Sequence, residues 1–99
     1  MKLATTMAPV PVVRFRLYVA GDTPNSVLAL ANLNAFCDDR FPGRYDIEIV
    51  DVFDRPEEAL REGVFMTPLL VKLSPLPQKR IVGTLGSPAV VMHALVLSD

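Results

Sequence analysis

Only a few side chains in this sequence are suited to covalent, metal or redox chemistry. The 99 residues contain one cysteine, Cys37, and one histidine, His93. A single cysteine cannot form an internal disulfide, which fits a reducing, cytoplasmic setting, and two soft ligands are too few for a metal centre. We therefore expect no cofactor and no metal. We also expect Cys37 to pack as a small apolar side chain and His93 to be satisfied or on the surface.

The segment from Ala20 to Ser26 is a second candidate, because it joins a predicted strand to a predicted helix, where α/β proteins often bind ligands. It contains no Cys, His or Lys and only one glycine, Gly21. It is therefore neither a Gly-rich phosphate loop nor a Cys-x-x-Cys redox centre. Thr23 and Ser26 have no general base nearby in the sequence, so we expect them to cap the helix. This loop therefore offers no recognisable catalytic group.

The composition limits the class of protein further. A chain of this length forms one domain, for which we predict residues 13–99, preceded by a flexible tail over residues 1–12. A net charge of -1 and a pI near 5.7 argue against nucleic-acid binding, and no apolar run approaches the ~18 residues that span a membrane. The mean hydropathy of +0.34 is high for a small chain. We therefore expect some apolar surface to contact another subunit or a partner.

The first elements can be predicted from hydrophobic periodicity. Residues 15–20 alternate with the period of a strand, and Pro24 suits the first position of a helix. The helix should bury one stripe, with Asn34 inside it and with Asn32, Asp38 and Asp39 pointing away. The predicted stripe contains Val27, Leu30, Ala31, Leu33 and Cys37. A strand followed by a helix in this way is the first half of a βαβ unit.

The remaining elements complete an α/β order. Residues 45–52 alternate as a strand, which a right-handed crossover makes parallel to the first. We then predict a short helix capped by Asp54 and ended by Gly63, a strand over 64–73, a turn over 74–78, a strand over 79–83, and a helix opened by Ser87-Pro88. The order βαβ-α-ββ-α is that of a single thioredoxin-like domain, in which Thr67-Pro68 is a candidate cis bond.

Several motifs together resemble one family. They are the Leu17-Tyr18-Val19-Ala20-Gly21 string with Thr23-Pro24-Asn25-Ser26, then Asp51-Val52, Thr67-Pro68 and Lys79-Arg80-Ile81-Val82-Gly83. From about Phe15 to Leu97 the chain resembles the KaiB family of bacterial circadian clock proteins. It is also similar to the sensor domain of the clock histidine kinase SasA.

This resemblance implies a non-catalytic interaction module that binds a KaiC-type ATPase in a circadian or stress-related timing system. It implies two folds: a thioredoxin-like monomer, and a form with a rearranged second half that self-associates into dimers or tetramers. Lys72, Lys79 and Arg80 are the expected partner-binding residues, unless they form only a solvated hairpin surface. At positions where family members often carry basic residues, this chain has Leu28 and Gly63.

Two alternatives remain from the sequence. The first is a glutathione-binding or redox protein of thioredoxin-like fold, although Gly86-Ser87 stands where glutathione transferases usually have Glu-Ser. The second is a stand-alone sensor domain of the SasA kind. The expectation of two folds also has physical support. The predicted last helix contains the β-branched residues Val90, Val91 and Val96, which have a low helix preference.

Overall fold

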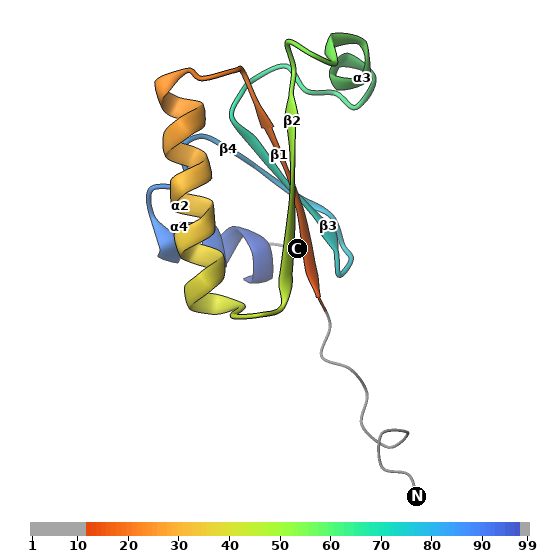
Figure 1. Ribbon diagram of the computed structural model, residues 1–99. Coiled ribbons are helices and arrows are strands. Elements are labelled where there is room, and N and C mark those ends of the chain that lie inside the picture. The colour runs from red at the N-terminus through yellow and green to blue at the C-terminus, as the bar shows by residue number, and fades with distance from the viewer. Residues whose placement is uncertain (1–11, 98–99) are drawn as a thin grey trace, which may run out of the picture.

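The computed structural model describes residues 12–97, and its first three elements form the predicted βαβ unit (Figure 1). Strand β1 (Val13–Val19) leads into helix α2 (Pro24–Arg40), and strand β2 (Tyr45–Asp51) returns parallel to β1. The predicted tail lies outside the described residues except for Val12. Helix α2 begins at Pro24, as predicted, since this residue has no N–H to leave unpaired in the first turn.

The second half adds a short helix, a hairpin and a terminal helix. These elements are α3 (Pro56–Arg61), β3 (Leu69–Ser74), β4 (Lys79–Val82), α4 (Pro88–Met92) and a π-helical turn, η1 (His93–Leu97). Strand β3 pairs antiparallel with β1 and with β4, so the four-stranded sheet has the order β2-β1-β3-β4. The structure therefore has the predicted mixed α/β order, with β2 and β4 at the two edges.

The sheet separates two apolar cores. Helices α2 and α4 lie on one face of the sheet, and α3 lies beyond one end of it (Figure 1). On the α2 face the core is formed by Val13, Phe15, Leu17, Val19, Ala29, Leu33, Phe36, Cys37, Leu70, Leu85, Val91 and Leu95. The smaller core on the opposite face contains Tyr18, Val50, Ala59, Val64, Leu69 and Val71. Strand β1 contributes to both cores, because Tyr18 is buried in the second one.

The buried stripe of α2 differs from the predicted one. Val27 is 56% exposed, and Ala31 and Asn34 are also exposed. The buried residues are Ser26, Ala29, Leu33, Phe36 and Cys37. Because α2 carries apolar residues on more than one side, hydrophobicity alone did not fix its rotation against the sheet.

Two local boundaries also differ from the predictions. Strand β3 begins at Leu69 and not at Val64, because Pro68 has no N–H to donate to a ladder. The N-cap of α3 is Arg55 and not Asp54, without a side-chain cap bond. The peptide bond between Thr67 and Pro68 is cis, as predicted, and the bonds that precede Pro75 and Pro77 are also cis.

Candidate functional site

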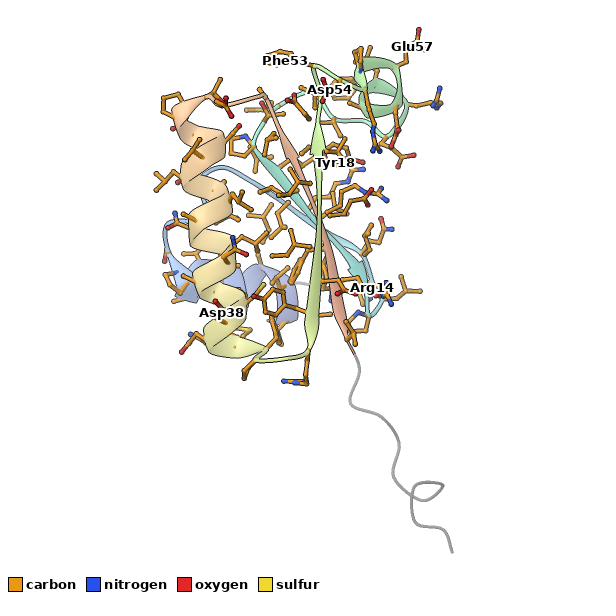
Figure 2. The ribbon with its side chains drawn as sticks, viewed as in Figure 1. Arg14, Tyr18, Asp38, Phe53, Asp54 and Glu57 are labelled. Carbon is orange, nitrogen blue, oxygen red and sulfur yellow. The ribbon has the colours of Figure 1, made fainter. Side chains whose placement is uncertain are left out.

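Large apolar side chains are exposed around α3. Phe65 is 80% exposed, Phe53 is 70% exposed, and Leu60, Met66 and Val82 are more than half exposed. We call these five residues the α3-end surface. Figure 2 shows Phe53 beside α3 at the end of the molecule opposite Arg14. A monomeric protein rarely leaves so many large apolar side chains in water on one small region, so this surface is suited to contact with another protein.

The local sequence explains why these side chains point outward. Ala59 and Val64 are buried in the smaller core and fix α3 and the segment after it against the sheet. The backbone N–H of Val64 donates to the Ala59 carbonyl at 2.9 Å, and Gly63 has a positive φ of 75° that ends the helix. Phe65 and Met66 follow this turn, before β3 begins, and therefore have no sheet neighbour to cover them.

Arg80 of β4 holds the same turn from the hairpin side. Its Nη2 donates to the Glu62 carbonyl at 2.6 Å, and its Nη1 donates to the Gly63 carbonyl at 3.4 Å. These carbonyls lie just after α3, where the helix dipole is negative, so the guanidinium is well placed. Arg80 thus positions the residues of the α3-end surface and also lies at its margin.

Two shallow hollows flank the segment from Gly63 to Met66. One, of about 200 Å³, is lined by Gly63, Phe65, Met66, Leu69, Arg80 and Val82. The other, of about 290 Å³, is lined by Val52, Phe53, Pro56, Ala59, Leu60 and Val64. Both linings are mainly apolar. Each hollow could accept an apolar side chain of a partner, but neither contains paired groups for acid–base or nucleophilic chemistry.

The three basic residues expected to bind a partner do not form one patch. Lys72 pairs with Lys79 across β3 and β4, whereas Arg80 is paired with Val71. Because neighbouring strand residues point to opposite faces, Lys72 and Lys79 lie on the α2 face and Arg80 lies on the other. Lys72 is only 8% exposed, so it does not present its charge to a partner in this conformation.

The junction of β1 and α2 uses its hydroxyl groups for structure. The Ser26 Oγ is buried and accepts hydrogen bonds from the Ala20 N–H at 3.0 Å and from the Thr23 hydroxyl at 2.9 Å. Thr23 is the N-cap residue, as expected, but its side chain bonds to Ser26 and not to the helix backbone. The Asp51 carboxylate also accepts from the Gly21 N–H at 3.1 Å. These bonds give the hydroxyl groups of this loop a structural role.

Cys37 and His93 are placed as the sequence predicted. Cys37 is fully buried in the larger core, where burial raises the pKa of its thiol to about 12, with a smaller contribution from Asp38. His93 is exposed at the start of η1. Over residues 12–97, no group of three or more His, Cys, Asp or Glu side chains could hold a metal ion, and no helix is long and apolar enough to cross a membrane.

The position expected to bind glutathione in a transferase has another role here. Ser87 is the N-cap of α4, and its Oγ accepts a hydrogen bond from the Val90 N–H at 3.4 Å. In the loop before it, the Thr84 carbonyl accepts a hydrogen bond from the Asn32 side chain of α2 at 2.8 Å. Asn32 therefore contacts this loop and does not point away as predicted.

Sequence reasoning missed the α3-end surface. Phe65 and Met66 were assigned to the interior of a strand, where alternate side chains would be covered. Pro68 was the signal that could have found this surface. Because proline has no N–H to donate to a sheet, the strand is better started after Pro68, which leaves residues 64–67 as a loop. A chain segment with two large apolar residues in a loop then predicts an exposed apolar site.

Comparison with known structures defines the class of protein. The fold is similar to that of chloroplastic thioredoxin z, with a TM-score of 0.67 and 20% identity, covering 83% of this chain and 74% of that one. It is also similar to the N-terminal domain of SasA from Synechococcus elongatus, with a TM-score of 0.72 and 18% identity over 94% of this chain and 91% of that one. The protein has a thioredoxin-like fold, as predicted.

Sequence comparison then gives the family. The KaiB domain model matches residues 16–96. A relative from Synechococcus elongatus, named Circadian clock oscillator protein KaiB, is 40% identical over 91 residues, which cover 92% of this chain and 89% of the relative. The chain belongs to the KaiB family. The predicted resemblance is confirmed, and the relative's name is that of a clock oscillator component and not of an enzyme.

Proposed function

We propose that this protein is a non-catalytic interaction module that binds a KaiC-type ATPase in a circadian or stress-related timing system. The observation that carries the proposal is the α3-end surface, an exposed apolar region on a member of the KaiB family. The relatives are named as clock oscillator proteins, which supports a role in timing. The buried, neutral Cys37 and the hydrogen-bonded β1–α2 loop argue against a redox or glutathione-dependent role.

Binding at this surface would rest mainly on Phe65 and Met66. These two side chains are exposed on a turn that is held in place by Arg80 and by the buried Val64, so little chain entropy would be lost when a partner covers them. Large apolar side chains on a rigid turn are typical of the few residues that dominate interface energies. Arg80 would act at the margin of this surface, where charges mainly affect the association rate.

We also propose that the thioredoxin-like form is the binding-competent monomer and that a rearranged second half forms dimers or tetramers. Physical support comes from the terminal helix. Val90 is 62% exposed and Val96 is also exposed, so burial does not compensate for their low helix preference. A form that buries these side chains in a subunit contact would gain stability as concentration rises.

The test is binding to the KaiC-type ATPase of the same host, measured by biolayer interferometry. The double variant Phe65→Ala with Met66→Ala is expected to weaken binding by about tenfold or more, which corresponds to about 1.4 kcal/mol or more. The matched control is Leu76→Ala, since Leu76 is 77% exposed in the turn after β3, at the far end of that strand. Equal affinity of all three proteins would contradict the proposal, as would saturable glutathione binding by the wild type.

A further inference from the structure

Lys72 of β3 is buried in an environment that does not favour a charged ammonium group. Lys72 is 8% exposed and lies directly opposite Lys79 in the β3–β4 ladder. Its Nζ donates one long hydrogen bond, 3.5 Å, to the Leu95 carbonyl of η1. Like charges in direct cross-strand register destabilise a sheet, and a buried ammonium group loses hydration that one long bond does not replace.

A cavity adjoins this amine. It has a volume of about 110 Å³ and is lined by Val13, Phe41, Lys72, Pro75, Leu95 and Val96. Lys72 is the only lining residue that titrates. On its own strand pair the facing charged group is Lys79, and its partner on β1 is Phe15. The cavity is thus a small apolar space with one amine in its wall and one further cation beside that amine.

This arrangement favours the uncharged form of the amine. Burial, and to a smaller extent the charge of Lys79, lowers the pKa of Lys72. A neutral lysine amine is a nucleophile, and an apolar cavity of this size admits a small uncharged electrophile while giving no stabilisation to a large or charged one.

We propose that Lys72 is a carbon dioxide acceptor that forms a carbamate in the cavity between β3 and η1. The amine nitrogen attacks the carbon of CO₂, one C–O π pair becomes the carboxylate, and the nitrogen releases one proton to solvent. No oxidant or reductant is needed. The product is an anion opposite Lys79, so the reaction creates an opposite-charge pair in this cross-strand register.

The carbamate would also change the contact with η1. The Lys72 amine donates to the Leu95 carbonyl, whereas the two carbamate oxygens can only accept hydrogen bonds and would turn toward Lys79. The carbamate nitrogen keeps one N–H, which is still able to donate to the Leu95 carbonyl. The modification therefore leaves a single donor for the contact between the sheet and the terminal helical turn.

The test uses the full chain with ¹³C-labelled bicarbonate at several pH values, followed by NMR and by trapping with a trialkyloxonium salt and peptide mass spectrometry. The chain has three lysines, Lys2, Lys72 and Lys79, so the modified site can be assigned directly. Label is expected at Lys72, increasing with pH as the amine loses its proton. It should be lost in Lys72→Arg and in protein unfolded by urea. Lys2 serves as an internal comparison in the same spectra.

A matched pair of variants at Lys79 separates the effect of charge from that of packing. Lys79→Arg keeps the cation and should keep the label at Lys72. Lys79→Gln removes the cation and should reduce the label, because the amine then binds its proton more tightly and the carbamate loses its partner. Circular dichroism would show that both variants are folded. Absence of label at Lys72, equal labelling of Lys2 and Lys72, or no difference between the two variants would overturn the proposal.

Discussion

Alkaline pH should destabilise this protein through Cys37. In the folded state burial raises the pKa of the thiol to about 12 from an ordinary value of 9.0. Above about pH 9 the unfolded chain therefore loses the thiol proton while the folded chain keeps it, so the unfolded state binds fewer protons and the free energy of unfolding falls as pH rises. The contribution is intact below pH 9 and is lost progressively up to about pH 12.

The expected size follows from the linkage relation. Each pH unit between the two pKa values removes about 1.4 kcal/mol, so about 2 kcal/mol is lost by about pH 10.5. The variant Cys37→Ala should be less stable than the wild type at about pH 8 by about 1 to 2 kcal/mol, because it leaves a small void in the core. At about pH 10.5 this difference should shrink to near zero, because only the wild type has the titrating thiol.

Urea unfolding at a series of pH values measures this difference directly. Leu33→Ala is the matched control, since it also opens the core beside α2 but removes no group that titrates at alkaline pH. Its difference from the wild type should stay constant over the same range. If the difference in unfolding free energy between Cys37→Ala and the wild type also stays constant with pH, burial does not raise the pKa of the thiol and the reasoning is refuted. At neutral pH the same shielding predicts no insulin-reducing activity, and Cys37→Ser should lose stability but keep partner binding.

Three further outcomes are expected. Ser26→Ala should cost about 0.5 to 1.5 kcal/mol in urea unfolding, because the part-buried Ala20 N–H and Thr23 hydroxyl lose their shared acceptor. A cost below the measurement error would contradict this role. Val90→Ala should favour the thioredoxin-like monomer in concentration-dependent NMR, because alanine has the higher helix preference. Val91 is left unchanged because it is buried, so its replacement would also remove core packing. Unchanged spectra at all concentrations would leave the two-fold proposal without support. Replacing Arg80 with Ala should slow association with the ATPase at low ionic strength more than at high ionic strength. Equal rates for the variant and the wild type would exclude a role for this charge.

The order of elements was predictable because local signals were strong in the first half. The alternation in β1 and β2 and the Pro24 start of α2 each depend on a few neighbouring residues. The rotation of α2 was not predictable in the same way. It depends on Ser26, a polar residue that is buried because its hydroxyl satisfies donors of the preceding loop, and a hydrophobicity pattern treats such a residue as exposed.

The candidate surface shows the same limit. Arg80 was singled out for its charge, and the structure adds that it binds the carbonyls after α3. The resemblance also implied Lys72, as a basic residue of the second half, yet strand alternation and the packing of η1 bury it on the other face. Strand register decides which cations share a surface. Register depends on how a strand pairs with its neighbours, which the residues of that strand alone do not specify.

The register of β4 also affects how copies of this protein meet. Strand β4 is an edge of the sheet, and its open side carries backbone groups that are able to pair with another strand. Its first two residues are Lys79 and Arg80. Two copies aligned β4 to β4 would bring four cationic side chains together, two on each face of the joined sheet. Electrostatic repulsion therefore protects this edge from continuous sheet formation between identical chains, and a dimer of the thioredoxin-like form would have to use another surface.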